Sequence, residues 1–273
     1  MLPLLRSELF RLRRRWMATV LLLIVVLGVA AVYIILWLVY ANTSGMEKIE
    51  QAEDLRVAAV PDVGMDIANF LSTIVAVILA ASIIGTEYGW GTIRALLPRA
   101  RSRVALIGAK LVTLVLFDVL LVLAGFLTAA IFSTVIANIE GLDNSLGSGF
   151  WGDSIQSIAS NVFLLFPFSA LAFFIAVLTR SNAAGIAIGL AILLAEGIAV
   201  SILEALSDSL DWVGDLLFSN NMAAILNENN PGGRDPGRDL PDTGQAIFVL
   251  LVWIVLLVAG SLWVFRRRDV TSG

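Results

Sequence analysis

Six long apolar runs constrain the fold of this chain more than any other feature. The 273 residues are 59% hydrophobic and 15% charged, which is more apolar surface than a soluble domain of this size can bury. A helix of about 20 residues crosses the roughly 30 Å hydrocarbon core of a bilayer. We therefore predict an all-α integral membrane protein with a single transmembrane domain over residues 1–273. The six predicted spans lie at 16–40, 67–84, 104–137, 161–179, 183–203 and 245–265.

The distribution of basic residues predicts the orientation of these spans. Lys and Arg concentrate in the cytoplasmic loops of membrane proteins. With six spans, all 18 Lys and Arg residues except Lys48, Arg56, Arg234 and Arg238 fall on the side of the N-terminus. Most acidic residues fall in the opposite loops. The sequence therefore predicts that both ends of the chain are inside.

The N-terminal stretch 1–15 spaces its leucines three and four residues apart among arginines. This pattern predicts an amphipathic helix that lies on the inner leaflet of the membrane. One role for such a helix is that of a positively charged membrane anchor and nothing more. The other is that of an anchor that also contacts and supports a cytosolic partner. The sequence leaves both roles open.

The loop at 85–103 reads GTEYGWGTIRALLPRARSR and is chemically richer than a simple reversal of direction requires. We expect Thr92 to cap a short helix that Pro98 ends. We expect the second span to break at three glycines, namely Gly85, Gly89 and Gly91. Tyr, Trp and Arg are the residue types that dominate protein interfaces. The alternative is an aromatic belt with arginines that contact lipid headgroups.

The same loop carries a pattern that resembles a known family. The pattern consists of Glu87, Gly91-Thr92, the stretch IRALL, Pro98, Ser102-Arg103 and Gly108-x-Lys110. It resembles the loop between the second and third spans of type-2 ABC transporter permeases, the six-span membrane subunits of ATP-binding-cassette exporters. In that family this loop contains a coupling helix that docks into a cytosolic ATPase. The resemblance implies that the ATPase-coupling residues are Glu87, Tyr88, Trp90, Gly91, Thr92, Ile93, Arg94, Leu97, Arg99 and Arg103.

The resemblance also implies partners. The chain has no G-x-x-x-x-G-K-[ST] motif and so cannot build a phosphate cradle of that kind. We therefore expect no enzymatic activity in this chain and no catalytic residues. ATP and Mg²⁺ are expected on two copies of a separate ABC ATPase, with a second copy of the permease or a close relative beside this one. The implied location is the inner or plasma membrane of a prokaryotic cell. The sequence contains no His and no Cys, and we predict no cofactor or metal bound by this chain and no nucleic-acid partner.

Two carboxylates, Asp118 and Glu196, lie inside predicted spans. Acidic residues in a bilayer are costly and usually face the interior of a helix bundle or a wet cavity. Glu196 is a candidate for the substrate path because the resembling family lines that path with its fifth helix; the alternative is a hydrogen-bonded packing residue. Asp118 is also a candidate for the substrate path, but its place nearer the cytosolic end favours a structural role, with an Arg or Ser partner on a neighbouring helix. In the fifth span, Gly185 and Gly189 form a GxxxG pattern that permits close helix packing.

The outer loops carry little that indicates a folded receptor domain. The first, at 42–66, contains an acidic helical patch. The loop at 204–244 begins with a pattern typical of a membrane-surface helix over 204–217 and continues as a turn-rich stretch. A different class of function also remains open, namely a secondary transporter or channel in which Asp118 and Glu196 couple to ions. A membrane enzyme is less favoured because no nucleophile and base pair is evident.

Overall fold

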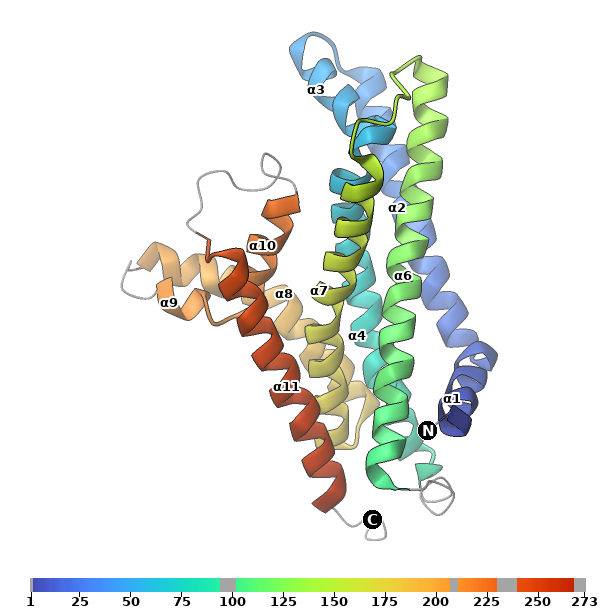
Figure 1. Ribbon diagram of the computed structural model, residues 1–273, viewed down its shortest axis with the longest axis vertical. Helices are drawn as coiled ribbons and strands as arrows, with labels where there is room; N and C mark the ends of the chain where they lie inside the picture. The colour runs from blue at the N-terminus through green and yellow to red at the C-terminus, as the bar shows by residue number, and fades with distance from the viewer. Residues whose placement is uncertain (1, 94–101, 207–210, 230–239, 268–273) are drawn as a thin grey trace.

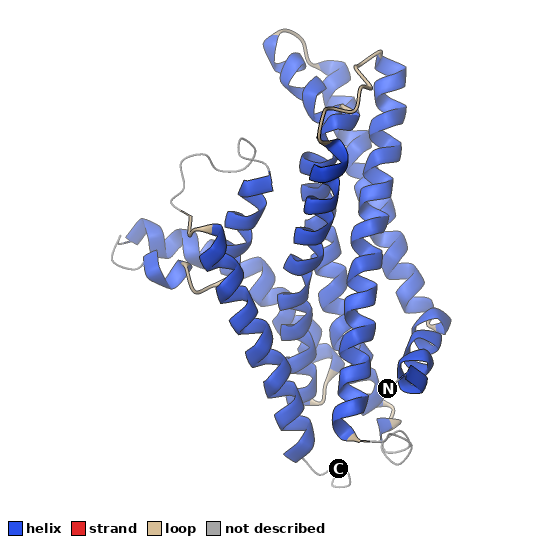
Figure 2. Ribbon diagram, viewed as in Figure 1, coloured by secondary structure: helices blue, strands red, loops and turns tan. Residues whose placement is uncertain are grey.

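A computed structural model describes residues 2–93, 102–206, 211–229 and 240–267. These residues form helices and connecting loops without any strand (Figure 2). The prediction of an all-α fold is therefore confirmed. Within the described ranges, six helices are long and apolar enough to cross a membrane: α2 (Trp16–Asn42), α4 (Met65–Gly89), α6 (Arg103–Glu140), α7 (Phe150–Thr179), α8 (Asn182–Leu206) and α11 (Thr243–Arg267).

Helices α4 and α7 form the centre of the bundle. They pack along each other, with α2 and α6 on one side and α8 and α11 on the other (Figure 1). In their apolar stretches 72% and 67% of the residues are buried inside the protein, against 28% or less in α2, α8 and α11. The exposed apolar surface of these three helices suits contact with lipid, because apolar side chains in a bilayer need no protein cover.

The helix α8 lies very close to both central helices. A Cβ atom added at Gly185 would meet the Cβ atoms of Ala81 in α4 and Ala176 in α7 at 2.8 and 2.9 Å. A Cβ atom at Gly189 would meet Val77 Cγ1 at 2.9 Å. The GxxxG pattern therefore lies at the contact of α8 with two helices, where small residues let the backbones approach.

The amphipathic N-terminal helix is α1 (Leu2–Arg14). In Figure 1 it lies at the same end of the bundle as the last turn of α11, and we call this the N/C end. One face of α1 packs against α6 near the end of α4. The buried residue at the centre of that face is Glu8, a charged side chain rather than one of the leucines.

The second span does not break where the glycines predicted it would. Helix α4 continues through Gly85 to Gly89, so the prediction is wrong for Gly85. Gly85 instead allows α4 and α8 to pack closely, because an added Cβ would meet the Cα of Asn182 in α8 at 2.5 Å. The turn itself contains Gly91, which has a φ of 67°. The predicted short helix is described only to Ile93, and its end at Leu97 and Pro98 lies outside the described residues.

The fourth long helix starts much earlier than the apolar run at 161–179 predicted. Helix α7 begins at Phe150, and its first turns are polar. One face of these turns is nevertheless buried, where Ser157 Oγ donates to the carbonyl of Pro61 and Asn69 Nδ2 donates to Asn161 Oδ1 at 2.7 Å. A search for apolar residues overlooks polar side chains that are buried because they bond to one another.

The loops at 42–66 and 204–244 are helical over much of their described length, and the first lies at the far end of the bundle, opposite the N/C end (Figure 1). The acidic patch in 42–66 forms α3 (Met46–Leu55), followed by the short turns η1 (Val57–Ala59) and η2 (Val60–Gly64). The surface helix predicted over 204–217 is present only in part: α8 extends to Leu206, residues 207–210 lie outside the described residues, and α9 covers Asp211–Gly214. The next helix, α10 (Phe218–Asn229), was not predicted and packs against α7, α8 and α11.

Candidate functional site

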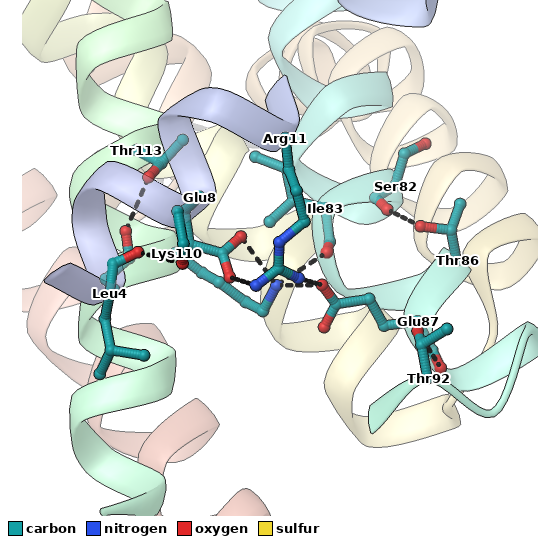
Figure 3. A network of polar contacts seen from close by, with 12 residues as sticks. Leu4, Glu8, Arg11, Ser82, Ile83, Thr86, Glu87, Thr92, Lys110 and Thr113 are labelled. Atoms are coloured by element: carbon teal, nitrogen blue, oxygen red, sulfur yellow. Dashed lines mark hydrogen bonds and ion pairs between the residues drawn. The ribbon is translucent and has the colours of Figure 1, made fainter. Parts of the chain in front are cut away.

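Four charged side chains meet at the N/C end, where α1 contacts α4 and α6 (Figure 3). We call them the charge cluster: Glu8 and Arg11 of α1, Glu87 of α4 and Lys110 of α6. Lys110 is 0% exposed and Glu87 is 1% exposed, and Glu8 is also buried. Arg11 forms the rim, with about a third of its side chain exposed. Charged groups are almost never buried this deeply without partners.

The distances in the charge cluster show that each charge has two opposite neighbours. Lys110 Nζ lies 2.6 Å from Glu87 Oε1 and 3.2 Å from Glu8 Oε2. The Arg11 guanidinium lies 3.1 Å from Glu87 Oε1 and 3.0 Å from Glu8 Oε1. Lys110 Nζ also donates to the carbonyl of Ile83 at 3.4 Å. Two cations and two anions thus alternate, and the charge cluster is neutral as a whole.

Local sequence explains how the charge cluster is assembled. Glu8 and Arg11 are three residues apart, so they lie on one face of α1. Glu87 lies in the last turn of α4, and Lys110 lies in the second turn of α6. Removal of one member would leave an uncompensated buried charge, which costs about 3–5 kcal/mol. The charge cluster therefore fixes how α1, α4 and α6 lie relative to one another.

Further contacts connect the turn after α4 to the start of α2. Arg15, which lies between α1 and α2, donates to Thr86 Oγ1 at 3.3 Å. Its guanidinium also lies 5.9 Å from the centre of the Trp90 ring. Thr92 Oγ1 donates to the carbonyl of Glu87 at 3.4 Å. Trp90 is nevertheless 72% exposed, so this large aromatic ring is available to a partner.

The structure separates the predicted ATPase-coupling residues into three groups. Glu87 and Ile93 are buried, and Tyr88 packs partly against the core. Trp90, Gly91 and Thr92 are exposed, and Arg103 is half-buried with its guanidinium donating to the carbonyl of Arg266 at 3.2 Å. The remaining members, Arg94, Leu97 and Arg99, lie outside the described residues. Glu87 thus holds helices together, and the exposed side chains beside it form the accessible surface.

Sequence reasoning did not find the partners of Glu87. Lys110 entered the sequence analysis only as part of the family pattern, but in the structure it is buried because α1 folds over it and supplies Glu8. A signal was present in the sequence, since Glu8 is the only acidic residue of the basic N-terminal helix. A single acid on an otherwise basic helix suggests a specific cationic partner.

The two carboxylates inside the long helices have separate surroundings. Ser169 Oγ in α7 donates to Asp118 Oδ1 at 3.4 Å, which is the serine partner on a neighbouring helix that we expected. Glu196 Oε1 accepts from the backbone N–H groups of Phe218 and Ser219, at the start of α10. The N-terminus of a helix favours a negative charge at this position. Asp118 and Glu196 therefore contact different helices.

Comparisons with known proteins show which family the chain resembles. A family model described as "Protein of unknown function (DUF2705)" matches residues 57–271, a range that includes Glu87, Lys110 and Glu196. The "Uncharacterized protein YhcI" of Bacillus subtilis (strain 168) is 23% identical over 220 residues, which cover 76% of this chain and 68% of that protein. With its six long apolar helices, the chain is a multi-pass membrane protein with a bacterial homologue.

Proposed function

Since the chain belongs to the DUF2705 family, which has no described function, we propose a role that rests on the geometry of the N/C end. The chain is the permease subunit of an ATP-driven ABC exporter. It supplies half of a path across the membrane, and a separate ATPase supplies the energy. The site of this coupling is the segment 85–103, at the junction of α4 and α6.

The observation that carries this proposal is the buried contact between Glu87 and Lys110 within the charge cluster. The two residues lie on the helices that flank the segment, and Glu8 and Arg11 attach α1 to both. A force applied to the segment would therefore move α1, α4 and α6 together. A loop that only reverses direction has no need of a buried network that links three helices.

The exposed surface beside the charge cluster suits a protein partner. Trp90 is exposed, and Arg15 stacks near its ring. Tryptophan and arginine are the residue types that contribute most to protein interfaces. The positive-inside distribution of Lys and Arg predicts that this surface is cytoplasmic, where an ATPase with bound ATP and Mg²⁺ would be found.

A movement at the segment has a direct route into the bundle. Helix α4 packs along α7, and α8 is in contact with both through Gly185 and Gly189. ATP-dependent closure of two ATPase subunits would displace α4 and change the packing of these helices in each of two permease copies. The path would then alternate between the two sides of the inner or plasma membrane of a prokaryotic cell.

A secondary transporter or channel is the second candidate. One oxygen each of Asp118 and Glu196, Oδ2 and Oε2, is buried without a hydrogen-bond partner among the described residues. Carboxylates with free oxygens inside a membrane are a common device for ion coupling. This alternative explains the two acids but assigns no role to the exposed Trp90 beside the charge cluster.

Purification of the tagged chain from its native membrane in a mild detergent distinguishes the two functions. We expect mass spectrometry to find an ABC ATPase in stoichiometric amounts with the purified chain. A chain that is purified alone, and that moves ions after reconstitution without ATP, would favour the alternative.

A further inference from the structure

A pocket of about 200 Å³ lies between α4, α8 and α10, beside α7. Its polar lining includes Glu196 of α8 and Ser219 of α10. Its apolar lining includes Phe168, Leu193, Met222 and Leu226. Pockets that enclose a drug-sized ligand have volumes of about 300–1,000 Å³, so this one is suited to only a part of such a molecule.

The polar lining has unused hydrogen-bonding capacity. Glu196 is 8% exposed, and its Oε1 accepts a hydrogen bond from the backbone of α10. Its other oxygen, Oε2, is buried without a hydrogen-bond partner within the described part of the chain. The Oγ of Ser219 is likewise buried without such a partner there. Buried polar atoms that lack a partner are costly, and a ligand that supplies hydrogen-bond donors would remove this cost.

The charge in the pocket selects among ligands. The N–H groups of α10 donate to Glu196 Oε1 and stabilise the ionised carboxylate, whereas the burial of Glu196 opposes ionisation, so a cationic ligand would stabilise the charge further. None of the described residues that line the pocket is a Lys or Arg that could neutralise this charge. An ammonium group has a positive charge and several donors, so it can bond to Glu196 Oε2 and Ser219 Oγ together.

The rim of the pocket indicates where the rest of the ligand would lie. Phe70 of α4 lines the pocket and is 55% exposed. The neighbouring face of α8 exposes Leu194 and Ile198, both of which are apolar. An apolar body attached to the ammonium group can therefore leave the pocket past Phe70 and remain against apolar side chains.

We propose that this pocket binds the primary ammonium group of an amphiphile, with Glu196 and Ser219 as its hydrogen-bond acceptors and Phe70 at its exit. As a binding site the pocket is independent of the function proposed above. As the place where an exported substrate is recognised, it rests on that function. The ammonium group can belong to a free amphiphilic amine or to the headgroup of an aminophospholipid, because both present the same chemistry.

Calorimetric titration of n-octylammonium into the full chain in phosphatidylcholine nanodiscs, without ATPase or ATP, tests the proposal. Empty nanodiscs provide the background, and n-octanol is the neutral ligand of the same chain length. We expect saturable binding of n-octylammonium and none of n-octanol. Glu196→Gln should weaken binding at least tenfold, because hydrogen bonds to charged groups are among the strong ones. Asp118→Asn is the matched control, since it changes a buried carboxylate outside the pocket, and it should leave the affinity unchanged.

Two further variants keep the test decisive if Glu196→Gln disturbs α10. Ser219→Ala removes the hydroxyl but retains the backbone N–H that donates to Glu196, and it should weaken binding several-fold. Leu226→Trp should abolish binding because the larger side chain fills the pocket. Equal affinity for n-octanol, or unchanged affinity in the Ser219 and Leu226 variants, would overturn the proposal.

Adding phosphatidylethanolamine to the nanodiscs identifies the source of the ammonium group. If this lipid competes with n-octylammonium and the competition depends on Glu196, the natural ligand is a lipid headgroup. If the lipid does not compete, the natural ligand is a free amine. The titration contains no ATPase, so a failure of n-octylammonium to bind would not count against the exporter function. Likewise, a failure to co-purify an ATPase would not count against binding in this pocket.

Discussion

Lys110 Nζ lies 2.6 Å from Glu87 Oε1, although the two residues are 23 positions apart and both side chains are buried. The part of the chain between them contains the loop that we assign to an ATPase. The contact closes the base of that loop and joins the helices on either side of it. Glu8 and Arg11 then bring the N-terminal helix into the same unit.

Replacing Lys110 with Met should lower the free energy of unfolding by about 3–5 kcal/mol, because two buried carboxylates would then share Arg11 as their one charged partner in the cluster. The double variant Lys110→Met with Glu87→Gln should recover much of the loss, since Glu8 and Arg11 remain as a neutral pair. Thermal unfolding of the purified protein in one detergent measures both. Losses that simply add in the double variant would contradict the coupling described here.

Replacing Gly85 with Ala should destabilise the fold by about 1–3 kcal/mol, because the new Cβ would meet the backbone of Asn182 at 2.5 Å. Gly89→Ala is the control in the same helix, since a Cβ at that position would meet no described atom within 4 Å apart from its own helix backbone and chain neighbours. The control should be neutral or slightly stabilising. If Gly85→Ala were as harmless as the control in chemical denaturation, Gly85 would not be a packing contact between α4 and α8.

Replacing Gly185 with Ala should loosen α8 from both central helices, because the added methyl group would lie 2.8 Å from Ala81 and 2.9 Å from Ala176. Hydrogen exchange measured by mass spectrometry should show faster exchange along α8. Gly197→Ala, further along the same helix, has open space and should leave the exchange rates unchanged. Equal protection in the two variants would show that the GxxxG pattern contributes nothing to packing.

The sequence predicted the long helices well because apolar residues are needed wherever a helix crosses a bilayer, and the acidic outer helix α3 was also expected. It did not predict the start of α7, since the first turns of this helix are polar and Ser157 is buried there through its hydrogen bond to the Pro61 carbonyl. Nor did it predict α10, whose polar composition suggested a loop. Helix α10 begins where Glu196, more than 20 residues earlier, accepts its first N–H groups, and this contact depends on tertiary packing.

The candidate site was predicted in part for a similar reason. The residue types in the segment 85–103 favoured an interface, and Trp90 of this segment is exposed in the structure. The burial of Glu87 and Lys110 could not be read from their neighbours in the sequence. It depends on the position of α1, which places Glu8 between two helices that are distant from it along the chain.

Retention of an ATPase by variants of Trp90 tests the central claim most directly. Trp90→Ala removes the exposed ring beside the charge cluster, and Trp151→Ala is a matched control because Trp151 is 68% exposed in the first turn of α7, at the far end of the bundle. Both proteins should insert and fold equally well. We expect the wild-type chain and Trp151→Ala to purify with an ABC ATPase from the native membrane. With Trp90→Ala, the amount of ATPase recovered should fall at least tenfold. Equal ATPase recovery with Trp90→Ala, or no ATPase with the wild-type chain, would contradict the assignment of this surface.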